Sequence, residues 1–226
     1  MKHFRLFNPM ALLLVFGLSA CSTTESHRNV EVGQTRAARE QYNGPRSTIV
    51  VGKFDNRSSF MNGIFSDGED RLGSQAKNIL ITHLQQTNRF TVLDRDNTEL
   101  ALRETEISGQ TRELIGGYYL ITGDVSEFGR KEVGDYQLWG ILGRGKKQVA
   151  YARINLNIID TRSSALVWAA QGAGEYELSQ REILGFGSSS SYDATLNGKV
   201  LDLAIREAID SLVDAIYDGR WNPAGI

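Results

Sequence analysis

Residues 149–160 read VAYARINLNIID, and apolar and polar side chains alternate along them with a period of two. The pattern places the apolar residues on one face of a strand: Ala150, Ala152, Ile154, Leu156 and Ile158. It places the other set on the opposite face: Tyr151, Arg153, Asn155 and Asn157. Such alternation is typical of a β-strand that buries one face against a core. The turn-forming DTRSS (160–164) and the β-rich SALVWAAQGAGEYEL (164–178) come next, so we expect a second strand beside the first.

The flanking sequence predicts further strands and helices around this pair. Runs of β-branched or aromatic residues at 48–54, 89–95 and 118–128 are expected to be strands. Apolar residues recur at helical spacing in 70–87 and 194–217, with Asp193 as a candidate N-cap of the second helix, and 96–106 begins with capping-type residues. The resulting order, β-α-β-α-β-β-β-α, predicts an α+β fold with helices packed on a mixed β-sheet.

The N-terminus predicts a lipid anchor. A basic start precedes the apolar run ALLLVFGLSA (11–20), which is too short to span a bilayer as a mature helix. LSAC (18–21) resembles a bacterial lipobox, whose cysteine is diacylated on sulfur, becomes the first residue and is acylated on nitrogen. We therefore expect a signal peptide at 1–20, a covalent diacylglycerol and acyl chain on Cys21, and a polar tether over 21–47 that leads to a folded domain at 48–226. Ser22, in place of aspartate, implies the outer membrane, with the domain on the periplasmic side.

A glycine- and lysine-rich stretch, GILGRGKK (140–147), is close to a phosphate-binding loop in composition. Such a loop needs a Ser or Thr after the lysine and a following helix, whereas here Lys147 holds the hydroxyl position and a period-two strand pattern follows. We interpret the stretch as the tip of a hairpin, in which Gly143 and Gly145 turn the chain and no nucleotide is bound.

Two segments are long for connections within a sheet, at about 126–150 and about 174–199. They contain or adjoin aromatic residues of the kind found at membrane interfaces, Tyr136, Trp139, Tyr151 and Phe186. They also contain charged residues, which only the lumen-facing positions of a membrane barrel tolerate, Arg130, Lys131, Glu132, Arg181 and Glu182. Composition therefore leaves two interpretations open, membrane hairpins and solvated loops.

Composition argues against several function classes. The 226 residues carry a formal net charge of -2, without the basic excess that binding to nucleic acid requires. Beyond the signal peptide the only cysteine is the lipidated one, and the histidines are His27 in the tether and His83 on a helix. So few ligands and nucleophiles predict neither thiol catalysis nor a zinc site. We expect no enzyme activity, no metal and no cofactor apart from the lipid on Cys21.

Several segments, in this order, resemble the curli secretion channel family (CsgG/HfaB). They are VVGKFDNRSS (50–59), RFTVLDRDN (89–97), GGYYLITGDVSEF (116–128), VAYARINLNIIDTRSSALVWA (149–169) and LAIREAIDSLVDAI (203–216). The resemblance implies a lipid-anchored periplasmic domain whose two long excursions are amphipathic β-hairpins. Copies would assemble into a ring and pool four strands each into one oligomeric outer-membrane β-barrel, because a hairpin alone would leave unpaired edges in lipid.

The resemblance also implies a pore constriction. In such channels a loop after the first strand narrows the pore with aromatic and amide side chains. The matching segment is 58–66, which makes Phe60, Asn62 and Phe65 the candidate constriction residues, with a spacing that differs from that of the curli channel. Anchoring of the loop in the domain core is the alternative role for these side chains.

The leading hypothesis is an outer-membrane lipoprotein that forms, or helps form, a secretion channel for extracellular fibre or adhesin subunits. Its expected partners are copies of itself, the outer membrane, the secreted polypeptide and accessory assembly proteins. The second excursion is shorter than that of the curli channel, and the family resembles lipoproteins that form no pore. The alternative is therefore a periplasmic lipoprotein that binds and regulates an envelope partner such as a peptidoglycan synthase.

Overall fold

The computed structural model describes residues 32–60, 69–111, 113–136, 144–181 and 196–223. Residues from Gly33 onward form one compact unit. The signal peptide, Cys21, the proposed tip at 137–143 and the Gly/Ser-rich run at 182–195 lie outside the described residues.

A five-stranded sheet forms the frame of this unit, with the strand order β2-β1-β3-β4-β5. The strands are β1 (Ser47–Asn56), β2 (Phe90–Leu93), β3 (Tyr119–Tyr136), β4 (Arg144–Asp160) and β5 (Leu166–Arg181). β1 runs parallel to both of its neighbours, whereas β4 runs antiparallel to both β3 and β5. The sheet is therefore mixed, as the sequence predicts.

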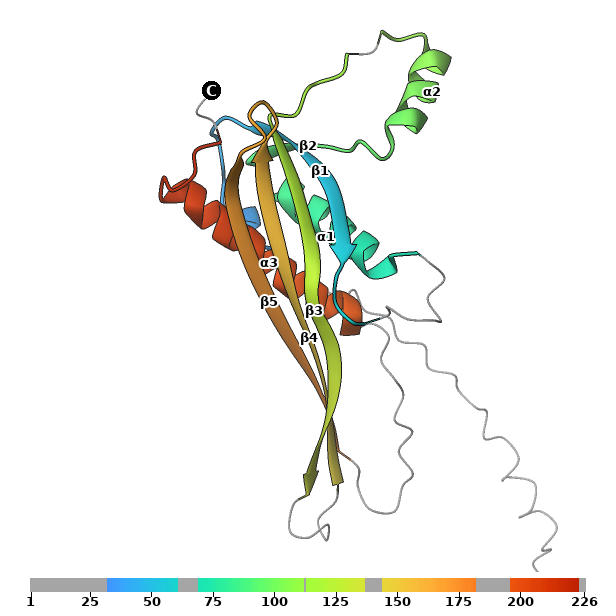
Figure 1. The fold of residues 1–226 in the computed structure, drawn as a ribbon, viewed down its shortest axis with the longest axis vertical. Coiled ribbons are helices and arrows are strands. Elements are labelled where there is room, and N and C mark those ends of the chain that lie inside the picture. The colour runs from blue at the N-terminus through green and yellow to red at the C-terminus, as the bar shows by residue number, and fades with distance from the viewer. Residues whose placement is uncertain (1–31, 61–68, 112, 137–143, 182–195, 224–226) are drawn as a thin grey trace, which may run out of the picture. The chain divides into compact units, whose positions relative to one another are not determined.

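Helices α1 (Arg71–Gln86) and α3 (Leu196–Tyr217) pack on one face of the sheet, and they also contact each other. α1 contacts β1 and β2, and α3 contacts β4 and β5 (Figure 1). The Asp70 side chain caps α1 by accepting a hydrogen bond from the Gly73 amide at 2.7 Å. The stripes predicted from helical spacing are confirmed, because Leu72, Ala76, Leu80 and Leu84 of α1 and Leu201, Ile205, Ile209 and Leu212 of α3 are buried.

The period-two pattern of residues 149–160 is confirmed in β4. Ala150, Ala152, Ile154, Leu156 and Ile158 are all buried under the helices. Tyr151 and Arg153 are exposed, and Asn155 and Asn157 are half-exposed on the other face of the sheet. The predicted α+β fold and its element order are thus found in the structure.

The β3–β4 hairpin extends into the segment 126–150, where the sequence predicts a long excursion. The strand predicted at 118–128 continues to Tyr136, whose backbone pairs with Arg144. Gly145, which we expected to turn the chain, lies within β4 opposite Asp135 and Arg181, so that assignment was wrong. A strand rather than a helix follows Lys147, as the hairpin interpretation requires.

Part of the expected tether belongs to the folded unit. Residues 33–40, here called the N-terminal strap, include a short 3-10 helix, Ala37–Arg39. Thr35 and Ala37 are buried, and the Arg36 guanidinium lies 2.7 Å from an Asp214 carboxylate oxygen of α3. Arg36 also donates its backbone amide to Asp210 at 2.9 Å. The folded domain therefore begins before residue 48, where we had placed its start.

Two glycines of β5 allow α3 to approach the sheet closely. A β-carbon added at Gly172 would lie 1.9 Å from the Ala204 carbonyl oxygen, and one at Gly174 would lie 2.7 Å from the Val200 carbonyl oxygen. These are helix backbone atoms, which cannot rotate away. Any side chain at either position would push α3 off the sheet.

We expect Gly172→Ala to lower the free energy of unfolding by about 1–3 kcal/mol, because it overpacks the contact between the β5 and α3 backbones. Urea denaturation of the purified domain measures this loss. Gly198→Ala in α3 is the matched control, since its β-carbon would meet only the end of the Gln75 side chain at 3.1 Å. Equal stability of the Gly172→Ala variant and the wild type would contradict the packing argument.

Candidate assembly surface

No described helix packs on the face of the sheet opposite α1 and α3 (Figure 1). This face is formed by the residues that alternate with the buried ones, and the strand register arranges them in rows across the sheet. Each row has its own chemistry, and the rows follow one another along the strands.

The first row is apolar and crosses all five strands. The register aligns Leu93 with Val50, Val50 with Leu120, Leu120 with Ile159, and Ile159 with Leu166. We call these residues the apolar row. Its members are half-exposed except Leu166, at the β5 edge, which is 59% exposed. Sequence reasoning missed this row, because its members come from separate strands and only the register brings them together.

The second row is polar and links the three antiparallel strands. Asn155 donates its side-chain amide to the Asp124 carboxylate at 2.9 Å, and Gln171 donates its amide to the Asn155 carbonyl oxygen at 2.9 Å. These residues line an open depression on the sheet with Asn157 and Ala169. Alternation in the sequence predicted the outward placement of Asn155 and Asn157 but not their partners.

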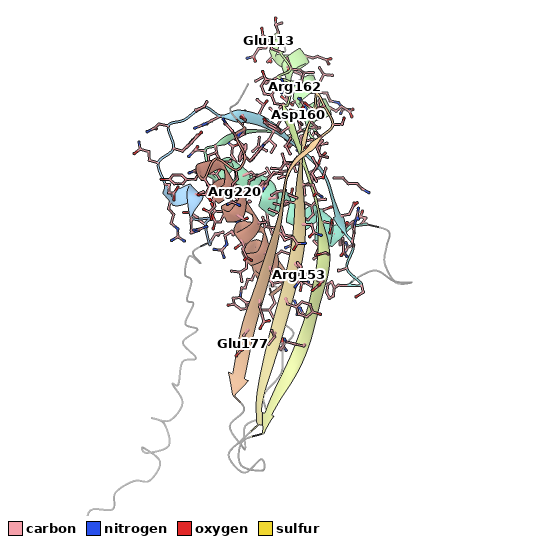
Figure 2. All side chains as sticks on the ribbon, turned by 60° about the vertical axis from the view of Figure 1, so that its left-hand side comes forward. Glu113, Arg153, Asp160, Arg162, Glu177 and Arg220 are labelled. Atoms are coloured by element: carbon pink, nitrogen blue, oxygen red, sulfur yellow. The ribbon has the colours of Figure 1, made fainter. Side chains whose placement is uncertain are left out.

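The third group is charged and lies toward the extended ends of the strands. Arg153 forms an ion pair with Glu127 at 2.7 Å, and Lys131 lies 4.0 Å from Glu175. Figure 2 shows Arg153 midway along β4 and Glu177 further along the extension. Among the aromatic candidates, Tyr151 is 37% exposed and its ring lies over Gly129. A β-carbon added at Gly129 would lie 2.4 Å from the Tyr151 hydroxyl oxygen.

α3 covers the base of the strand extension on the other side. Arg130 donates to the Asn197 side-chain oxygen at 3.0 Å, and the Lys199 ammonium lies 5.1 Å from the centre of the Tyr176 ring. Trp139 and Phe186 lie outside the described residues, as does the side chain of Tyr136. The described part of the extension is therefore its base, which is held between charged pairs on one face and α3 on the other.

Both edges of the extension lack a neighbouring strand in the part of the chain that the structure describes. β1 pairs with β3 only as far as Val125, where Ser126 forms a β-bulge, so the outer edge of β3 is open from Glu127 onward. β5 pairs with β4 alone among the described strands. One backbone amide on its outer edge, that of Ala173, donates to the Glu207 carboxylate at 2.7 Å.

The loop after β1 contains the candidate constriction residues. Phe60 is half-buried, and its ring centre lies 4.6 Å from that of Phe128. Asn56 donates its side-chain amide to the Phe60 carbonyl oxygen at 2.7 Å, which holds the start of the loop against β1. Asn62 and Phe65 lie outside the described residues. In this chain Phe60 thus contacts the core, the arrangement that the anchoring role requires.

The histidine on a helix, His83, is buried between α1 and α3. Its Nε2 lies 2.6 Å from an Asp202 carboxylate oxygen, and the other oxygen of Asp202 lies 2.9 Å from Arg206. Among the residues that the structure describes, no three His, Cys, Asp or Glu side chains are grouped as a metal site would need. His83 therefore serves the packing of the two helices.

None of the helices within the described ranges is both long enough and apolar enough to cross a membrane.

Comparison with known proteins places these features in context. Residues 32–224 match the family described as "Curli production assembly/transport component CsgG". A protein of Neisseria meningitidis serogroup B (NMB1126/NMB1164), whose name describes it as a lipoprotein, is 62% identical over 206 residues, which are 91% of this chain and 92% of that protein.

The solved structures that match this chain are much more distant in sequence. The PelC dodecamer of Paraburkholderia phytofirmans is 15% identical with a TM-score of 0.36, and the match covers 76% of this chain and 95% of that one. Lipoprotein GNA1162 of Neisseria meningitidis is 12% identical with a TM-score of 0.37, over 76% of this chain and 99% of that one.

The turn between β4 and β5 predicts that the stability of the folded unit depends on pH. Hydrogen bonds from the Ser163 amide, together with bonds from the Arg162 side chain and amide, lower the pKa of Asp160 from 3.8 to about 2. A carboxyl group whose pKa is lower in the folded state adds stability above its unfolded pKa. This contribution is therefore complete above about pH 4 and is lost as the pH falls through about 2.

We expect Asp160→Asn to be less stable than the wild type at neutral pH and to lose less stability between pH 4 and pH 2. Thermal unfolding followed by circular dichroism across this range measures both effects. Asp218→Asn is the control, since that carboxylate faces solvent and pairs only with Arg220 at 3.0 Å among the ion pairs described. Parallel pH profiles of wild type and Asp160→Asn would contradict the assignment.

Proposed function

Because this chain belongs to the CsgG family, we propose that it is an outer-membrane lipoprotein that assembles with copies of itself to form, or help form, a secretion channel for extracellular fibre or adhesin subunits. The folded unit would lie on the periplasmic side, held by the diacylglycerol and acyl chain on Cys21. No nucleotide, nucleic acid or metal takes part in this proposal.

The observation that carries the proposal is the strand extension with its two open edges. Backbone N–H and C=O groups on a free strand edge pair with another strand, and in lipid they must do so because no water is present to satisfy them. The outer edge of β3 beyond Val125 and the outer edge of β5 lie on opposite sides of the same extension. Pairing of one copy's β3 edge with the next copy's β5 edge repeats head to tail, and such an interface forms a ring when the rotation between copies closes.

The charged residues at the base of the strand extension are compatible with this proposed ring. Arg130 and Lys131 are consecutive residues on opposite faces of β3, which a lipid-facing strand would not tolerate. Arg130 donates a hydrogen bond to Asn197 of α3, and Lys131 forms an ion pair with Glu175 of β5. We therefore propose that the base of the extension, where these residues lie, is outside the lipid.

The first experiment is negative-stain electron microscopy of the lipidated protein after gentle detergent extraction from outer membranes. We expect closed rings with a stain-filled centre, and mass spectrometry should detect the lipid on Cys21. Cys21→Ser is the control for anchoring and should remove the protein from the membrane fraction. Only monomers or irregular small species would overturn the proposed ring and leave a periplasmic partner-binding lipoprotein.

A second prediction concerns Phe60. Replacement by alanine removes its contact with Phe128 and should lower the free energy of unfolding by about 1–3 kcal/mol, less than for a fully buried phenylalanine. If Phe60 also narrows a pore in the ring, single-channel conductance in planar bilayers rises in the same variant.

Ser59→Ala is the matched control, because Ser59 precedes Phe60 in the same loop and is exposed. It should change neither stability nor conductance. A loss of stability in Phe60→Ala with unchanged conductance of intact rings would restrict Phe60 to loop anchoring.

A further inference from the structure

The segment that joins β2 to β3 leaves the sheet and returns to it with a helix in the middle. We call residues 94–117, without residue 112, the α2 arm; it includes α2 (Thr98–Ser108). No residue of α2 is buried, and Figure 1 shows the helix standing away from the sheet. Leu100 and Ile107, seven residues apart and therefore on one side of α2, are 59% and 79% exposed. A helix of this length is marginal in water without tertiary packing, so α2 needs an apolar surface to pack on.

The topology of the sheet indicates which surface this is. β2 and β3 both run parallel to β1, and α1, which joins β1 to β2, lies on the face that the helices cover. The arm then carries the chain back past β1, from β2 to β3. Connections between parallel strands of one sheet are right-handed almost without exception, so a connection in the reverse direction belongs on the opposite face. That face carries the apolar row.

The end of the arm already lies against the apolar row. A β-carbon added at Gly117 would lie 2.5 Å from Val50 Cγ2 and 3.6 Å from Leu93 Cδ1, so the Gly117 backbone packs on two members of the row. Thr161, in the turn between β4 and β5, donates its hydroxyl to the Gly117 carbonyl oxygen at 2.8 Å. The arm therefore re-enters the sheet over the row and beside the β4–β5 turn.

The segment between α2 and this contact is long enough to bring the helix onto the row. Residues 109–116 span up to about 27 Å when extended, whereas the apolar row crosses five strands and is about 19 Å wide. Gly109, at the end of α2, has a φ of 64°, and a β-carbon added at Gly116 would meet no atom within 4 Å. Glycines at both ends of the segment allow it to change direction without a steric penalty.

The described position of the arm is held by side chains at its root. Lys77 of α1 pairs with Asp96, and the Arg95 guanidinium donates to the Ile115 carbonyl oxygen at 2.6 Å. The Asp96 side chain is 64% exposed, and ion pairs that face solvent contribute little. The pair with α1 therefore holds the arm toward the helix-covered face only weakly.

We propose that the α2 arm is a lid that closes over the apolar row of its own chain, with Leu100 and Ile107 against the row. The position described above is the open one. Closure removes the apolar end of the uncovered face from water, and opening exposes the row and the apolar side of α2 together. The lid does not depend on the proposed ring, because both surfaces belong to one chain.

Cross-linking in the full lipidated chain tests the lid. Ile107→Cys is combined with Leu120→Cys, in the centre of the row, and membranes are treated with a short bismaleimide, which does not require the two sulfur atoms to touch. We expect a cross-linked monomer, detected as a faster band in denaturing electrophoresis and as a linked peptide pair by mass spectrometry. Ile107→Cys with Glu175→Cys is the control, because Glu175 is exposed on the same face but about 30 Å from Leu166 along β5.

Two results would overturn the lid. One is the absence of the cross-linked monomer when Leu120→Cys alone still reacts with a maleimide. The other is a product that links two copies without any product inside one chain, which would show that α2 covers the row of a neighbour. Neither result affects the electron micrographs, which test the proposed channel separately.

The accessibility of the row gives an independent measure. In the Leu120→Cys chain, Leu100→Ser with Ile107→Ser should raise the rate of maleimide modification at least about threefold, because the open position becomes the populated one. Lys77→Ala, which removes the ion pair between α1 and the arm, should lower the rate, since the arm is then freer to close. Glu175→Cys in the same backgrounds is the control and should react at an unchanged rate. Equal rates for Leu120→Cys in all backgrounds would contradict the lid, with circular dichroism showing that each variant is folded.

Discussion

The contact between the α3 backbone and β5 determines how the rest of the unit is arranged. Gly172 and Gly174 have no side chains, so the helix lies against the strand backbone itself. In that position α3 covers β4 and β5, while α1 covers β1 and β2, and His83 and Asp202 join the two helices at 2.6 Å. Because both helices occupy one face, no helix among the described residues packs on the other face of the sheet.

The open face explains why one chain combines features that a closed domain would not show. Its rows change from apolar to amide to ion-paired along the strands, so the two ends of the sheet present different chemistry to a neighbour. At one end are the apolar row and α2 (Thr98–Ser108), and at the other is the strand extension with its free edges.

Much of this fold could be predicted from the sequence because its signals are local. The alternation of residues 149–160 predicts which side chains of β4 are buried, and helical spacing predicts the buried stripes of α1 and α3. The N-terminal strap could not be predicted, because Arg36 contacts Asp210 and Asp214, which are far away in the sequence. The apolar row depends on register across five strands, so it is not visible in any single segment. Of the candidate site residues, sequence reasoning named Phe60 but could not assign its contact with Phe128.

The N-terminal strap also determines where tension on the N-terminus acts on the folded unit. Tension on the chain before Gly33 reaches the unit first at Arg36, whose amide and guanidinium both bind carboxylates of α3. The strap also accepts hydrogen bonds from Arg89, the residue before the edge strand β2, at the Ala37 carbonyl oxygen and the Glu40 carboxylate. Tension on the N-terminus therefore acts on a helix and on a sheet edge together, so both must give way before the strap is freed.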